Sequence, residues 1–117
     1  MKKREINKLD KLWSEKVRSF GRCECCSTMQ KKLDAAHIVG RIRRATRWGI
    51  MIDGKYDSNG LCLCFICHQG FDQHLPIEKY IREDVIGIKR YEWLQATKNI
   101  LAKYQDYNTI KEMIENG

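Results

Sequence analysis

Two cysteine pairs, each with two residues between the cysteines, constrain this chain more than any other feature. Cys23 and Cys26 form the first pair, and Cys64 and Cys67 form the second. This spacing lets both thiolates of a pair face one tetrahedral ion, and two such pairs complete a closed four-cysteine zinc site. A redox role is the weaker interpretation because neither pair lies in a βαβ pattern. The sequence therefore predicts a structural Zn²⁺ site.

The two remaining cysteines leave alternatives open. Cys25 stands inside the first pair and is an alternative for one of the ligands. Cys62 precedes Cys64 by two residues, so both would share one face of a regular strand. We expect Cys62 to be a small buried thiol near the site.

Length and charge set the class of protein. The 117 residues indicate one domain, residues 1–117, in which a metal would reinforce a small core. The net charge of +7 favours an anionic partner, and nucleic acid is the commonest one. The sequence shows no signal peptide or membrane span, so we expect a cytoplasmic protein of a bacterium or phage-infected cell, where thiols stay reduced.

Periodicity predicts an N-terminal helix and a pair of strands. Apolar residues recur at three- and four-residue steps over residues 5–20, and Gly21 should end this helix. Residues 33–39 and 61–64 indicate two strands of a hairpin-like pair, joined by a long basic excursion. A further short strand is expected at 50–52, and connections of this length are usually functional.

The C-terminal third is predicted to be helical. Pro76 suits the start of a helix, and Gly87 should end or kink it. Another helix is predicted over 89–104, and Asn108 or Thr109 can cap a last short helix. We thus divide the chain into an N-terminal helix (1–21), a central core with the cysteine pairs (22–75) and C-terminal helices (76–117).

Two histidines and an asparagine accompany the cysteine pairs. His37 ends the first predicted strand, Asn59 lies in the turn before the second, and His68 follows Cys67 directly. With the segments Asp34-Ala-Ala-His-Ile and Asn59-Gly-Leu-Cys-Leu, this order resembles the HNH endonucleases over about residues 22–75. More narrowly, the chain is similar to the lambdoid phage NinG recombination proteins.

The resemblance implies an α+β fold with a small ββα-metal core, here held by the four-cysteine zinc site and flanked by helices. It also implies a metal-dependent nuclease that uses Mg²⁺ or Mn²⁺ on DNA, including branched or recombining DNA. In that chemistry His37 is the general base, Asn59 orients the loop and the base, and His68 binds the catalytic metal.

One position departs from the family pattern. Many HNH enzymes have a metal-binding His or Asp directly before the base, where this chain has Ala36. Asp72 follows His68 by four residues, so both share one face of a helix and form a sound ligand pair. Asp34, which would need the strand end to bend, and His74 are the weaker candidates.

The basic excursion is the expected DNA-binding surface. Guanidinium groups bind phosphate oxygens in a bidentate way, and the excursion carries Arg41, Arg43, Arg44 and Arg47. Trp48 could stack on an unpaired base or fill the core.

Two hypotheses of function follow. The first is a metal-dependent DNA endonuclease, and the second is a zinc-stabilised DNA-binding adaptor without catalysis. Oligomeric state stays open, with a homodimer through apolar residues of the C-terminal helices as one option.

Overall fold

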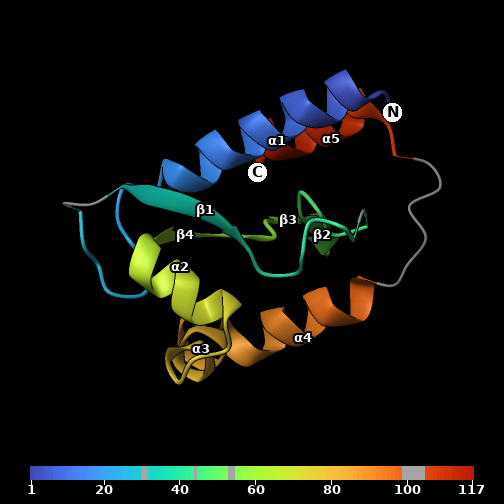
Figure 1. Cartoon of the computed structure of the whole chain (residues 1–117). Helices are drawn as coiled ribbons and strands as arrows, with labels where there is room; N and C mark the ends of the chain where they lie inside the picture. Colours follow the sequence, from blue (N-terminus) through green and yellow to red (C-terminus); the bar gives the residue numbers. More distant parts are fainter. Residues whose placement is uncertain (30–31, 44, 53–54, 99–104) are drawn as a thin grey trace.

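The chain folds into three layers in a computed structural model that describes residues 1–29, 32–43, 45–52, 55–98 and 105–117. Two helices, α1 and α5, form one layer, two small sheets form the middle, and the remaining helices lie on the other side (Figure 1). This arrangement confirms the predicted α+β class. None of the helices among these residues is long and apolar enough to cross a membrane.

The central sheet is the predicted hairpin-like pair. Strand β1 (Leu33–His37) runs antiparallel to β4 (Gly60–Cys64), with Leu33 opposite Cys64 and His37 opposite Gly60. Every residue of β4 is buried because helices cover both faces of the pair. The long excursion forms a second sheet from β2 (Ile50–Ile52) and β3 (Lys55–Asp57), which confirms the strand predicted at 50–52.

The first layer packs on the sheet through an apolar cluster. Helix α1 (Lys3–Arg18) occupies nearly the predicted range and buries Leu9 and Trp13, and Gly21 follows it with φ of 85°. Trp48 from the excursion is 2% exposed in the same cluster, so it fills the core and is not available for stacking on a base. Burial of Trp48 is favourable because an indole side chain removes a large apolar area from water.

Helix α5 (Tyr107–Asn116) returns along α1, a contact that the sequence did not predict (Figure 1). Ile110 and Ile114 bury its apolar face against the α1 cluster. The prediction that Asn108 or Thr109 caps this helix was wrong. Asp106 is the cap, and its side chain accepts a hydrogen bond from the Thr109 backbone N–H at 3.1 Å.

The larger apolar cluster lies between the hairpin and the helices of the third layer. Helix α2 (Phe65–Asp72) follows β4 without a loop, and α3 (Ile77–Tyr80), the π-helical segment η1 (Ile81–Gly87) and α4 (Ile88–Thr97) complete the layer. Gly87 was predicted to end or kink the helix that starts near Pro76, and the π-helical segment η1 ends at Gly87, whose φ is 90°. The helix predicted over 89–104 is confirmed to Thr97, and residues 99–104 lie outside the described residues.

Candidate active site and cysteine cluster

Four cysteines meet at the junction of β4 and α2. The sulfur atoms of Cys23, Cys26, Cys64 and Cys67 all lie within 4.8 Å of one another, and those of Cys26 and Cys64 are 3.7 Å apart. A tetrahedral zinc ion with Zn–S bonds of about 2.3 Å requires sulfur separations of about 3.8 Å. The predicted cysteine pairs therefore form one cluster that could hold a metal ion.

The local backbone shapes this cluster. The Cys26 N–H points to the Cys23 sulfur at 3.4 Å, which is the turn that a two-residue spacing allows. Burial would raise the pKa of Cys23, but backbone N–H groups of Cys26, Cys64 and Cys25 outweigh it and lower that pKa to about 7. Burial, together with the neighbouring thiols, raises the pKa of Cys67.

The other two cysteines lie outside the cluster. The sulfur of Cys62 is 4.0 Å from the carbonyl oxygen of Arg18, and the Cys62 N–H donates to the Glu24 carboxylate at 2.6 Å. Cys25 is half-buried and packs against the main apolar cluster, and burial raises its pKa. The sulfur atoms that gather around one point are thus those of the two predicted pairs.

His68 lies between two carboxylates. Its Nδ1 is 3.1 Å from Oδ2 of Asp34 in β1, and its Nε2 is 3.1 Å from Oδ2 of Asp72, one turn later in α2. An ionised carboxylate only accepts hydrogen bonds, so Nδ1 carries a proton toward Asp34. Imidazole nitrogens and carboxylate oxygens are both metal ligands, so Nε2 and the Asp72 carboxylate can share a bound cation.

The Asp34 contact forms without distortion of the strand. Asp34 is opposite Leu63 in the regular pairing of β1 with β4, and the register continues through His37. Ala36 is fully buried in the main apolar cluster. The position where the family often has a ligand is therefore part of the core, and Asp34 supplies the carboxylate nearest to His68 from β1.

His37 is held at the end of β1 by an aromatic stack. Its ring lies on Trp13 of α1 with ring centroids 4.1 Å apart and an angle of 18° between planes. Its Nε2 is buried and has no hydrogen-bond partner among the described residues. Burial, with the charges of Arg47 and Arg41, lowers the pKa of His37 to about 4. The imidazole is consequently neutral at physiological pH.

Asn59 joins the chain after His37 to the start of β4. Its amide N–H donates to the Val39 carbonyl at 2.8 Å, and its Oδ1 accepts from the Val39 N–H at 2.8 Å. The Ile38 N–H donates to the Asn59 carbonyl at 3.2 Å, and the side chain is fully buried. This pairing fixes the backbone directly after His37.

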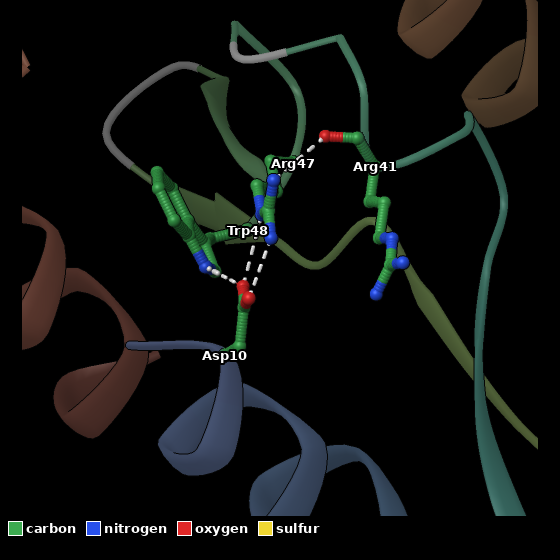
Figure 2. A network of polar contacts seen from close by, with 4 residues as sticks. All are labelled: Asp10, Arg41, Arg47 and Trp48. Atoms are coloured by element: carbon green, nitrogen blue, oxygen red, sulfur yellow. Dashed lines mark hydrogen bonds and ion pairs between the residues drawn. The ribbon is translucent and has the colours of Figure 1, made fainter. Parts of the chain in front are cut away.

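A carboxylate that the sequence reasoning missed anchors the basic excursion. Asp10 of α1 accepts from Arg47 Nε at 2.9 Å and Nη2 at 2.5 Å, and from the Trp48 indole N–H at 2.8 Å (Figure 2). Burial would raise the pKa of Asp10, but these hydrogen bonds and the Arg47 charge outweigh it and lower that pKa. The sequence did carry a signal for this contact. Asp10 lies three residues before Trp13, on the apolar stripe of the predicted helix, where a carboxylate indicates a polar partner from another segment.

The four predicted DNA-binding arginines have different settings. Arg41 is exposed, and its backbone carbonyl accepts from Arg47 Nη1 at 3.2 Å (Figure 2). Arg43 is exposed, and Arg44 lies outside the described residues. The Arg47 side chain is 15% exposed and is paired with Asp10.

A cavity of about 810 Å³ brings the candidate residues together. His37, Arg41, His68, Asp72 and His74 all line it, so strand, excursion and helix side chains face one space. His74 reaches it from just beyond α2 in a left-handed conformation, with φ of 55°. The arrangement offers a neutral imidazole, an imidazole–carboxylate pair and a guanidinium to one ligand.

A hairpin that runs directly into a helix, with imidazoles from both and a cysteine cluster at their junction, defines a ββα nuclease-type core. The comparison with protein families agrees, since a family model described as HNH endonuclease matches residues 23–76. Residues 23–76 are therefore similar to the HNH endonuclease family. Comparison with curated proteins and with solved structures found no match.

Proposed function

We propose that the chain is a metal-dependent endonuclease that hydrolyses phosphodiester bonds of DNA. The observation that carries this proposal is the position of His68, which has a carboxylate at each ring nitrogen in a cavity shared with the neutral His37. A zinc-binding adaptor would need the cysteine cluster but not this second group of side chains. The match of residues 23–76 to an HNH endonuclease family model supports the same conclusion.

The donors around His68 suit a divalent metal ion. Asp34 fixes the proton on Nδ1, which leaves Nε2 and the Asp72 carboxylate as ligands, and metal-binding histidines are commonly held by a carboxylate in this way. A bound Mg²⁺ or Mn²⁺ would polarise the scissile phosphate and stabilise the leaving oxygen. We assign Asp34 to orientation of His68, and His74 is the remaining candidate ligand.

His37 is proposed as the general base. Its imidazole would accept a proton as the oxygen of a water attacks phosphorus and the bond to the leaving oxygen breaks. The Nε2 atom has no partner within the described part of the chain, which supports this role, because a buried ring nitrogen without a partner is costly unless a water or substrate satisfies it. Asn59 is proposed to orient the loop after His37 and not to contact substrate.

Arg41 and Arg43 are the proposed phosphate contacts. Both are exposed, and Arg41 lines the cavity with His37. Arg47, by contrast, is proposed to hold the excursion through Asp10, with the side chain of Arg44 outside the described residues. We propose Zn²⁺ for the cysteine cluster, where it would contribute folding energy to a small domain.

A plasmid-nicking assay with added Mg²⁺ or Mn²⁺ tests the nuclease proposal. We expect the wild type to nick supercoiled plasmid, and His37→Ala and His68→Ala to reduce the rate by at least about 100-fold. His74→Ala separates the candidate ligands, because it should retain most activity if Asp72 completes the site. If the folded wild type binds plasmid without nicking it under either metal, the adaptor hypothesis replaces this one.

The biological setting is a narrower part of the proposal. The NinG resemblance favours recombining or branched DNA in the cytoplasm of a bacterium or phage-infected cell. Tyr80 and Ile88 in the C-terminal helices are 48% and 47% exposed, which fits a homodimer face. Light scattering after size exclusion would test the dimer, and a monomeric mass would reject it.

A further inference from the structure

A second cavity continues the active-site cavity along the hairpin. It has a volume of about 780 Å³ and lies between α1, β1 and α2. His68 and Asp72 line both cavities, so they lie where the two spaces meet. A strand of DNA with its scissile phosphate at His68 would therefore extend its next nucleotide into this second space.

One aromatic side chain stands out in this second cavity. Phe65, the first residue of α2, lines it with 64% of its surface exposed. Phe65 precedes His68 by three residues, which places both side chains on one helix face with Cβ atoms about 5–6 Å apart. An exposed ring at this distance from the reacting centre can contact the nucleotide next to the cleaved bond.

The surrounding side chains suit a nucleotide. Besides Asp34 and Asp72 of the proposed metal site, Arg18 and the exposed Lys32 line the cavity, and their positive charge complements a phosphate. Gln69, one turn after Phe65 in α2, and Gln73, directly after the helix, line it too, and their amides can donate to and accept from a base edge. Ring, amides and cations together match the face of a base, its edge and its phosphate.

We propose that this cavity is a nucleotide subsite in which an unpaired base stacks on Phe65. The proposal rests on the proposed DNA-directed function and narrows its substrate class. Both faces of a base in a duplex are covered by its neighbours, so the ring can stack only on a base that has left its pair and stack. The preferred substrate is accordingly DNA with an unpaired nucleotide beside the cleaved bond, as in single strands, flaps or branch points.

Equilibrium binding separates this subsite from the nuclease activity. We would measure fluorescence anisotropy of a labelled oligodeoxynucleotide of about 16 nucleotides, single-stranded or as a blunt duplex, without added Mg²⁺ or Mn²⁺. The wild type should bind the single strand more tightly than the duplex. Phe65→Ala should weaken single-strand binding by about 5- to 150-fold and duplex binding by less than about 3-fold.

Two further variants make the test specific. Phe65→Tyr keeps a ring and should bind the single strand within about 3-fold of the wild type. Trp93→Ala removes an aromatic side chain of α4 that is 51% exposed and lines neither cavity, so it should change neither affinity. Circular dichroism would establish that each variant is folded.

The outcomes distinguish the two proposals. Equal single-strand and duplex affinities, or equal losses on both in Phe65→Ala, would overturn the subsite. A single-strand preference that depends on Phe65 in a protein that never nicks plasmid would keep the subsite and reject the endonuclease. Failure of the folded wild type to bind any DNA would reject both.

Discussion

Asp10 and Arg47 form a two-point ion pair between the N-terminal helix and the basic excursion (Figure 2). The same carboxylate accepts the indole N–H of Trp48, so α1 holds two consecutive residues of the excursion. Arg47 in turn donates to the Arg41 carbonyl, which fixes the backbone that carries the cavity-lining Arg41. Helix α1, which lies outside the segment that the family model matches, therefore helps to position the site.

We predict that Asp10→Ala destabilises the fold by about 1–3 kcal/mol, because it leaves a largely buried guanidinium and an indole N–H without their acceptor. Urea denaturation would measure the change. Lys8→Ala, at an exposed position of the same helix, is the control and should shift stability by less than about 0.5 kcal/mol. A midpoint for Asp10→Ala equal to that of Lys8→Ala would contradict this interpretation.

Gly60→Ala should also destabilise the protein. A Cβ at Gly60 would lie 2.6 Å from Val17 Cγ2 and 2.7 Å from Trp13 Cζ2, so α1 could not keep its distance from β4. We expect a loss of about 1–3 kcal/mol in the free energy of unfolding, measured by thermal or urea denaturation. Gly40→Ala is the matched control, because no atom of the described residues lies within 4 Å of the added carbon. Similar losses in both variants would show that packing against α1 is not the cause.

The sequence predicted the elements whose signals are local. Cysteine spacing, the periodicity of residues 5–20 and the turn before residue 60 lead to the cluster, α1 and the β1–β4 pair as observed. The His68–Asp72 pair also follows from helical spacing alone, because residues four apart share a face.

What the sequence did not predict depends on contacts between distant segments. The return of α5 along α1, and the choice of Asp10 as the partner of Arg47, are set by tertiary packing across the chain. Arg47 shows most clearly how a distant contact changes an interpretation. In the sequence it is one arginine of a basic run, which predicts a phosphate contact. In the structure the Asp10 carboxylate of α1 pairs with it. The sequence likewise left two roles open for Trp48, in the core or against substrate. Its burial in the apolar cluster with α1 and α5 assigns it to the core.

The cysteine cluster predicts a defined zinc stoichiometry. We expect about one zinc ion per chain in the purified protein, and loss of both zinc and cooperative thermal unfolding in Cys67→Ser. Cys25→Ser is the matched control, since Cys25 lies beside the cluster but outside the four converging sulfur atoms, and should retain the metal. Elemental analysis with circular dichroism would measure both effects. Retention of a full zinc equivalent by Cys67→Ser would exclude the four-cysteine site.

His37 gives the stability of the protein a pH dependence of known sign. Its pKa in the folded state is about 4, below its ordinary value of 6.5. Between these values the unfolded chain binds a proton that the folded chain does not, so acid favours unfolding. Stability should therefore be unaffected by this group above pH 6.5 and should fall as the pH drops from 6.5 toward 4. Allowing for partial solvent exposure, we expect a contribution of roughly 2 kcal/mol.

The measurement is a difference between variants, because carboxylates also titrate near pH 4. Urea denaturation from pH 7.5 to 4.5 should show a smaller loss of stability in His37→Phe, which keeps a ring on Trp13 but cannot bind a proton. His74→Gln is the control and should retain the wild-type pH dependence, because His37 is still present. Parallel curves for the wild type and His37→Phe would mean that His37 is not buried in its neutral form beneath α1.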